Sequence, residues 1–273
     1  MATRPSRAGS DPFPPTADPA AYVPRTATES VLVQLEMAVD DGARVMLLAG
    51  APGSGRTLLL HVLAGRLDGR LASLHVPYSK FTPRDLCQWL LASLGEPCET
   101  GSEHPELALR ARISRDACDG FPPKLLMLDD AGWMPPKTLE RVLELQADYP
   151  DALRTLLVVP ESYGVAPIER AGLACERVSL EGGMDAGETQ RYLRARLDHG
   201  AAEPGHRARV EQALDQLYRQ SDGNPGRLHA AVSVLLLRDS IPPRIPNRPS
   251  EPRFSADLAD RPAGSEILQG DPP

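Results

Sequence analysis

Short runs of aliphatic and β-branched residues alternate with helical patterns through the middle of the chain. Between these runs, Thr82 and Pro83 supply an N-cap and a proline at the first helical position, and Gly95 closes that helix. Pro135 and Pro136 open another helix. This order is typical of βαβ units, so we expect an α/β fold, a three-layer αβα core around a five-stranded parallel sheet. The expected strands cover residues 45–49, 71–76, 124–128, 155–159 and 177–180.

After residue 180 the strand signals stop and helical patterns take over. Asp185 and Glu188 form a capping box at the start of a helix through Leu197, with Gly200 beyond its end. Further helices are expected around residues 210–220 and from about 225 to 237. The core is therefore predicted to be followed by a small all-helical domain.

Both ends of the chain are rich in Pro, Ser, Asp and Arg and poor in large apolar residues. Such a composition does not offset the entropy of ordering a backbone, so both ends are expected to be flexible. The tail fits a partner-binding segment and an end without function equally well. We expect a flexible N-terminal segment over 1–27, the αβα core over 28–181, a helical lid over 182–239 and a disordered Pro-rich tail over 240–273.

Charge and cysteine content narrow the class of protein. Lys and Arg number 30 against 37 Asp and Glu, a formal charge of -7, so no global basic field favours nucleic acid or anionic lipid. Cys87, Cys98, Cys118 and Cys175 form no C-x-x-C pair and are expected to be reduced thiols that serve in packing. No run approaches the roughly 20 apolar residues of a membrane helix, so we expect a cytoplasmic protein without a membrane span.

A glycine-rich turn joins the first expected strand to a helix. It matches the Walker A pattern G-x-x-x-x-G-K-[ST] except that Arg56 replaces lysine. Glycines let successive backbone N–H groups face a phosphate, and the following helix presents its positive end to the same anion. The residues expected to bind nucleotide are Gly50, Ala51, Pro52, Gly53, Ser54, Gly55, Arg56, Thr57 and Leu58.

Thr57 and Arg56 decide whether this turn is expected to bind a metal ion and to support catalysis. Thr57 is expected to be a ligand of Mg²⁺. Arg56 keeps the positive charge of lysine but has a broad planar head, so binding is expected to survive while catalysis suffers. The alternative is a glycine-rich turn between strand and helix that holds no ligand.

An apolar strand that ends in Asp129 and Asp130 matches a Walker B element about seventy residues after the turn. The strand would deliver both acids to the carboxyl edge of the sheet, where ligands of α/β folds bind. We expect Asp129 to hold Mg²⁺ and Asp130 to orient or activate the attacking water. Asp130 is one methylene, or about 1.5 Å, shorter than glutamate, and a misplacement near 1 Å can cost roughly a hundredfold in rate.

With these two elements in place, residues 11–238 resemble the ExeA (GspA) branch of the AAA+ P-loop ATPases, close to the TniB and TnsC transposition ATPases. Pro12-Phe13, Asp18-Pro19 and residues 28–39 look like the stretch that precedes the first strand in this family. The resemblance implies that this stretch lies near the adenine.

The resemblance continues beyond the two Walker elements, with departures. The Asp-Glu-Ala-Gln of the family appears as Asp129 to Gly132, and its Gln-Pro-Glu as Val159 to Glu161, so both glutamines are missing. AAA+ proteins of this family usually have glutamate at the position of Asp130. The resemblance therefore implies a nucleotide site whose hydrolytic part is weakened.

The same resemblance supplies candidate arginines. Arg177 looks like the arginine finger that reaches the γ-phosphate of a neighbouring subunit, with Arg170 as a weaker candidate. Residues 221–228 resemble the sensor 2 signature, which makes Arg227 the lid arginine. Each of these arginines can also be an ordinary surface charge.

We therefore expect an ATP-binding AAA+ protein with slow ATP hydrolysis that couples nucleotide state to the assembly or remodelling of a protein partner. ATP and Mg²⁺ are the expected cofactors, and a homo-oligomer is consistent with the family. One alternative is a degenerate, non-hydrolysing nucleotide-binding scaffold. Another is a DNA-associated ATPase of the transposition type, although Arg110, Arg112 and Arg115 fit a solvated helix face better than a DNA-binding stripe.

Overall fold

The computed structural model describes residues 13, 17–77, 80–96, 104–162, 165, 175–200 and 202–237. Several sequence expectations lie outside these residues: those on Pro12, Cys98, Arg170 and the tail over 240–273. Within them, Cys87, Cys118 and Cys175 are not in disulfides.

A parallel sheet of five strands forms the centre of the molecule, in the order β2-β3-β4-β1-β5. Every expected strand is present, with ends that shift by at most two residues, because the buried aliphatic runs define them. The prediction of a five-stranded parallel sheet is therefore confirmed. The strands are β1 (Val45–Gly50), β2 (Ala72–Val76), β3 (Lys124–Leu128), β4 (Leu153–Pro160) and β5 (Glu176–Leu180).

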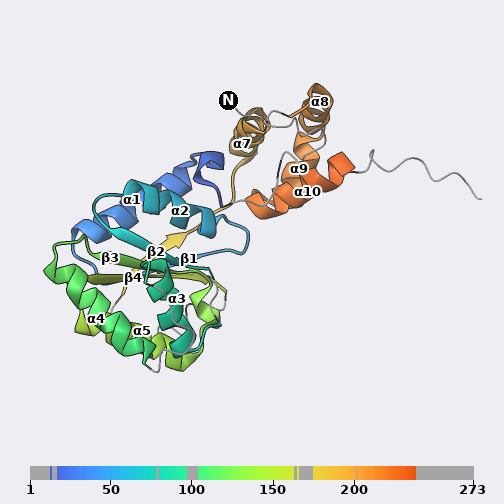
Figure 1. Cartoon of the computed structure of the whole chain (residues 1–273). Helices are drawn as coiled ribbons and strands as arrows, with labels where there is room; N and C mark the ends of the chain where they lie inside the picture. Colours follow the sequence, from blue (N-terminus) through green and yellow to red (C-terminus); the bar gives the residue numbers. More distant parts are fainter. Residues whose placement is uncertain are drawn as a thin grey trace, which may run out of the picture.

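Helices cover both faces of this sheet and make three layers (Figure 1). On β1, Met46 and Leu48 point to the α1 and α2 side, whereas Leu47 and Ala49 point to the other side. Both faces of β1 are therefore buried, as expected for a central parallel strand. One face carries α1 (Thr26–Asp40) and α2 (Arg56–Arg66); the other carries α3 (Pro83–Ser93), α4 (Pro105–Cys118) and α5 (Pro136–Asp148).

The predicted caps fix where these helices begin. The Thr82 side chain accepts a hydrogen bond from the Asp85 amide at 3.3 Å, with Pro83 at the first helical position. Asp185 likewise accepts a hydrogen bond from the Glu188 amide, at 2.6 Å. Both caps satisfy amides that have no partner inside their helix, as the sequence pattern indicates.

Beyond β5, four helices pack around a hydrophobic cluster of their own. Phe13 is 1% exposed and joins this cluster, with its ring 5.3 Å from that of His229. The helix expected around 210–220 is broken at Ala213, where φ is -101° and ψ is 7°. No glycine or proline marks this break, so the sequence pattern did not reveal it. The helices are α7 (Ala186–His199), α8 (Pro204–Gln212), α9 (Leu214–Ser221) and α10 (Pro225–Leu237).

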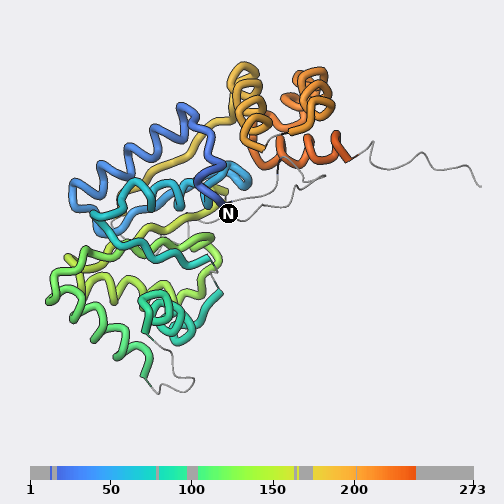
Figure 2. The backbone as a smooth tube through the Cα atoms, turned by 45° about the horizontal axis from the view of Figure 1, so that its top comes forward, coloured from blue at the N-terminus to red at the C-terminus, as the bar shows by residue number. Residues whose placement is uncertain are grey.

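This helical unit, called the lid below, stands beside the αβα core (Figure 2). The carboxyl ends of β1 and β3 meet at the same edge of the parallel sheet, where the lid touches the turn after β1. Among the described residues there are also two short 3-10 helices, η1 (Pro19–Ala21) and η2 (Ala131–Trp133). Among the described residues, no helix has the length and apolar character needed to cross a membrane.

Candidate nucleotide-binding site

The turn after β1 has the backbone of a phosphate-binding loop. Gly53 (φ 78°) and Gly55 (φ 98°) both adopt the left-handed region, which a side chain would strain. Gly55 is the N-cap of α2, and the Leu59 amide is the first to bond back into the helix, to Gly55 O at 3.0 Å. The amides of Arg56, Thr57 and Leu58 therefore lack partners within the helix and lie at its positive end.

The turn and the end of β3 meet through one short hydrogen bond. Thr57 Oγ1 donates to Asp129 Oδ2 at 2.6 Å, although 72 residues separate them. Asp129 is 8% exposed, so its carboxylate is held at the sheet edge rather than in solvent. The two residues expected to bind the metal ion are thus adjacent in the structure.

Two polar atoms inside the loop are buried without a hydrogen-bond partner among the described residues. They are Ser54 Oγ and Arg56 Nη1. The Arg56 side chain is 10% exposed, and its other terminal nitrogen, Nη2, lies 3.7 Å from Asp130 Oδ1. Because buried polar groups are normally paired, these two atoms indicate a missing acceptor or donor at the centre of the loop.

Asp130 occupies an unusual place at the end of β3. Its backbone is left-handed (φ 49°, ψ 38°), and its side chain is 55% exposed. Partial burial raises the pKa of Asp130, and the neighbouring Asp129 raises it further, while Arg56 acts in the opposite direction. The predicted water-positioning acid is therefore near the loop, but Arg56 is its ion-pair partner.

On the other side of the loop lies Arg25, a residue that the sequence analysis did not single out. It is 6% exposed, and its Nη2 donates to the carbonyl oxygen of Ser54 at 3.3 Å. A small cavity of about 30 Å³ lies here, lined by the loop, the N-terminal segment and the lid. The sequence Pro24-Arg25 before a helix does not predict that the arginine is buried, because its burial arises only from tertiary packing.

The lid contacts the loop through backbone atoms. The Gly226 amide donates to Gly53 O at 2.9 Å, and Asn224 Nδ2 donates to Pro52 O at 3.0 Å. A Cβ on Gly226 would lie 2.8 Å from Gly53 Cα, so neither glycine can carry a side chain without moving. We call this contact, between Asn224 and Gly226 of the lid and Pro52 and Gly53 of the loop, the lid latch.

The same turn of the lid also grips the linker that follows β5. The Met184 amide donates to Gly223 O at 2.9 Å. A Cβ on Gly183 would lie 2.4 Å from Asp222 O, and one on Gly223 would lie 2.1 Å from Met184 O. The turn is therefore packed backbone to backbone against the loop on one side and the linker on the other.

The side chains of the candidate arginines Arg227 and Arg177 do not contact the phosphate-binding loop through any bond described here. Arg227 lies in the first turn of α10 and is exposed; its amide, not its guanidinium, bonds Asn224 Oδ1 at 3.1 Å. Arg177 lies on the edge strand β5 and pairs with Glu161 at 2.8 Å within the same chain. The structure thus brings Arg227 to the latch and ties Arg177 to the residue that follows β4.

The arginines of α4 are paired with acids. Arg110 pairs with Asp148, and Arg112 donates to Asp116 at 2.7 Å. Arg115 lies 3.4 Å from Glu96. These pairs agree with a solvated helix face that is held by salt bridges.

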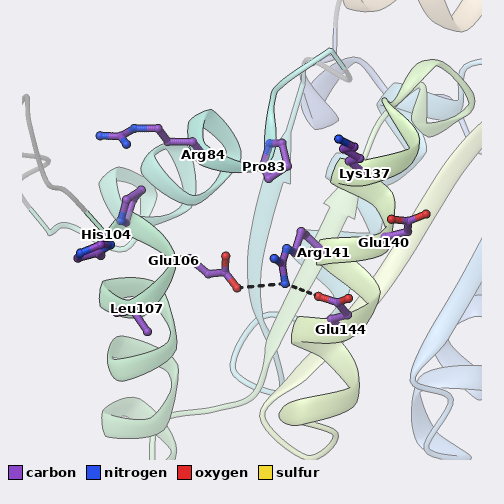
Figure 3. Close-up of a pocket in the computed structure, with 10 residues that line it drawn as sticks. Pro83, Arg84, His104, Glu106, Leu107, Lys137, Glu140, Arg141 and Glu144 are labelled. Atoms are coloured by element: carbon purple, nitrogen blue, oxygen red, sulfur yellow. Dashed lines mark hydrogen bonds and ion pairs between the residues drawn. The ribbon is translucent and has the colours of Figure 1, made fainter.

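A larger hollow of about 750 Å³ lies elsewhere, between the starts of α3 and α4 and one side of α5. Arg141 stands at its centre between Glu106 and Glu144, at 3.7 and 2.6 Å (Figure 3). Arg84 and Lys137 also line the hollow, as does Glu140, so three basic and three acidic side chains balance there.

This hollow is larger than the cavity beside Arg25. We nevertheless take the loop after β1 as the candidate site, because Thr57, Asp129 and the unpaired polar atoms of Ser54 and Arg56 lie there.

Comparisons with known proteins bear on the fold that carries this site. Residues 39–162 match the family model of an AAA domain. No curated protein matches the chain.

Solved structures of similar fold share little sequence with this chain. Cdc6p from Pyrobaculum aerophilum is 19% identical with a TM-score of 0.62, covering 82% of this chain, which spans 63% of that protein's length. Domain III of the replication initiation protein DnaA from Thermotoga maritima is 16% identical with a TM-score of 0.52, covering 84% of this chain and 90% of that one. The ORC2 protein of Aeropyrum pernix is 15% identical with a TM-score of 0.50, covering 78% of this chain and 69% of that one. This chain therefore matches an AAA domain over residues 39–162 and has the fold of the AAA+ P-loop ATPases.

Proposed function

We propose that this chain binds a magnesium nucleoside triphosphate between its αβα core and its lid and hydrolyses it slowly. ATP is the nucleotide that the family resemblance implies. The observation that carries the proposal is the pair of orphaned atoms in the loop, Ser54 Oγ and Arg56 Nη1, beside the amides at the start of α2. Phosphate oxygens would satisfy the arginine and the amides together, and a serine hydroxyl can donate to the same anion.

The fit to Mg²⁺ rests on Thr57 and Asp129. Mg²⁺ binds oxygen ligands octahedrally at about 2.1 Å, so neighbouring ligands lie about 3 Å apart. The two oxygens are 2.6 Å apart and both come from side chains that suit this ion. They need to separate by only a few tenths of an ångström to share the ion, whose role would be to neutralise phosphate charge.

Slow hydrolysis follows from the state of Asp130. A general base must reach the attacking water, and Asp130 is both short and paired with Arg56. Phosphate binding would draw Arg56 away from this carboxylate, because the phosphate offers more negative charge, so the ion pair would not persist in the nucleotide complex. The short reach of Asp130, which the ligand does not change, is therefore the reason to expect slow hydrolysis.

Coupling to a protein partner is the remaining part of the proposal. The lid latch supports it, because the loop that holds the phosphates also holds the lid. We propose Arg227 as the lid arginine that responds to the γ-phosphate and Arg177 as a finger toward a second copy, after release from Glu161. The resemblance to the ExeA branch supports these roles, and a homo-oligomer would be needed for the second.

One alternative has an observation in its favour. Asp130 is 55% exposed and ion-paired, which also fits a scaffold that binds nucleotide without hydrolysing it. The DNA-associated alternative would need free basic groups, whereas the α4 arginines described above pair with acids.

The full-length chain tests the proposal directly. We expect magnesium-dependent binding of ATP in a filter or dialysis assay, lost in Asp129→Ala and retained in Asp119→Ala, an exposed aspartate on the C-cap of α4. Slow phosphate release that disappears in Asp129→Ala supports an ATPase. Binding without release supports the scaffold, and no binding of any triphosphate contradicts the proposal.

A further inference from the structure

Residues 19–23 of the N-terminal segment run between the lid and the αβα core and are held by both. Nη1 of Arg196 on α7 donates a hydrogen bond to the carbonyl oxygen of Ala21 at 2.8 Å. Arg196 is 3% exposed and Ala21 is 7% exposed, so this bond is shielded from water. Val23 packs against the hydrophobic cluster of the lid. The lid therefore holds the segment at two residues.

Tyr22 lies between these two residues and is held by the core instead. Its side chain packs against the hydrophobic cluster that α1 and α2 make with the sheet. Its hydroxyl donates a hydrogen bond to Glu29 Oε1 at 2.9 Å and lies 2.8 Å from Thr28 Oγ1, and both residues belong to α1. Consecutive Cα atoms are only about 3.8 Å apart. The lid therefore cannot move away from α1 unless one of these two sets of contacts breaks.

Phe13 gives the segment a further anchor in the lid. Its side chain is 1% exposed, belongs to the lid cluster, and has its ring 5.3 Å from that of His229 on α10. Full burial of a phenylalanine side chain favours the packed state by roughly ten- to a hundredfold. We call Phe13 and residues 19–23 together the N-terminal strap.

The strap holds the lid more strongly than the lid latch does. The latch consists of two hydrogen bonds between neutral groups, each of which favours the closed lid by roughly two- to tenfold. The bond from Arg196 to Ala21 has a charged donor, and such a bond contributes roughly ten- to a hundredfold. The burial of Phe13 and Val23 adds to this figure. The contacts that decide whether the lid leaves the core therefore lie mainly in the strap.

We propose that the N-terminal strap is a releasable clamp that sets how often the lid leaves the phosphate-binding loop. Withdrawal of Phe13 from the lid cluster, or loss of the bond to Ala21, would leave the lid held mainly by the latch. Lid opening would then become more frequent without any change at the loop itself. This inference concerns the chain without nucleotide, so it goes beyond the proposed function and does not depend on it.

Two backbone amides report lid opening and lid loosening separately. The Gly226 amide donates across the latch to Gly53 O, and as the second residue of α10 it has no partner within the helix. It therefore exchanges with solvent when the lid leaves the loop. The Met184 amide donates to Gly223 O, and both residues move with the lid, so it exchanges only when the lid itself loosens. NMR measurement of hydrogen exchange on the full-length chain follows both amides.

The main variant is Arg196→Met, which removes the bond to Ala21 and keeps a side chain of similar length. Its matched control is Arg194→Met on the same helix, because the Arg194 side chain is 50% exposed and pairs with Glu211 within the lid. A second variant lacks residues 1–17, so that Phe13 is removed while residues 19–23 remain. Thermal unfolding checks that each variant folds.

We expect Arg196→Met to speed exchange of the Gly226 amide roughly ten- to a hundredfold and to leave that of Met184 unchanged, while Arg194→Met changes neither. The shortened chain should show the same pattern. Unchanged exchange of Gly226 in Arg196→Met overturns the proposal. Equal acceleration of both amides overturns it as well, because it would show that Arg196 stabilises the lid rather than its contact with the core. If Arg196→Met does not fold, the shortened chain decides by the same two amides.

Discussion

Replacing Gly226 with alanine tests whether the lid latch holds the lid on the phosphate-binding loop. The new Cβ would lie 2.8 Å from Gly53 Cα and 3.1 Å from Gly53 O. Both neighbours are backbone atoms, so no change of rotamer can make room. Alanine is also a better helix former than glycine, so α10 itself should not weaken. The perturbation therefore falls on the contact between lid and loop.

The magnitude follows from the hydrogen bonds that must break. The latch consists of Gly226 N to Gly53 O at 2.9 Å and Asn224 Nδ2 to Pro52 O at 3.0 Å. Each is worth about 0.5–1.5 kcal/mol net, so their loss costs about 1–3 kcal/mol. The ratio of closed to open lid should then fall roughly 5- to 150-fold.

Hydrogen exchange followed by mass spectrometry reads out this ratio. We expect faster exchange in Gly226→Ala for peptides that cover residues 50–58 and 222–230, and no change in β3. The control is Gly205→Ala in α8, where an added Cβ meets no atom within 4 Å. Unchanged exchange at the loop in Gly226→Ala would refute the idea that the latch holds the lid. An equal increase in Gly205→Ala would show general loosening of the lid instead.

Three further outcomes are expected. Burial raises the pKa of Cys87 to about 11, so at pH 8 its thiolate fraction is about 0.1% and maleimide should label it roughly a hundredfold more slowly than an ordinary thiol. The labelling rate should rise as the pH approaches 11, and fast labelling of the Cys87 peptide at pH 8 would contradict the burial of the thiol. Lys124→Ala removes the partner of the buried Asp116 that lies 3.0 Å away but leaves Arg112 paired with it, so urea unfolding should show a loss of roughly 1.5–3 kcal/mol, the worth of one hydrogen bond to a charged group; a change below about 0.5 kcal/mol, the scale of a surface substitution, would count against a buried pair. Asp130→Glu extends the carboxylate by one methylene and should raise phosphate release roughly ten- to a hundredfold; a fall in the rate would show that reach does not limit hydrolysis.

The elements that the sequence revealed are those whose signal is local. Each strand is a short aliphatic run, and the β1 turn carries glycines where the backbone requires φ above zero. Thr57 and Asp129 are far apart in sequence, but each follows the carboxyl end of a predicted strand. A parallel sheet brings the carboxyl ends of its strands to one edge, so the two residues meet there. That is why their proximity could be predicted from the sequence.

What the sequence did not reveal depends on packing between distant segments. Arg25 looks like an ordinary residue before a helix, but in the structure it is 6% exposed and its side chain bonds Ser54 O of the loop. The motif over 221–228 was interpreted through Arg227, whereas the contacts to the loop come from Asn224 and Gly226. The break at Ala213 has no punctuating residue. These features depend on how the lid packs, and a local sequence pattern does not predict that packing.

The turn at Asp222 and Gly223 packs tightly on the linker between β5 and α7, and this packing limits where the lid can pivot. Since Gly183 and Met184 are clamped to Asp222 and Gly223, they must travel with the helices that follow. Gly182 is the first residue before this clamp, with φ 80° and open space around it. A helix such as α7, with its 14 residues, is about 20 Å long. A torsion change of about 10° at Gly182 would thus move its far end by roughly 3–4 Å.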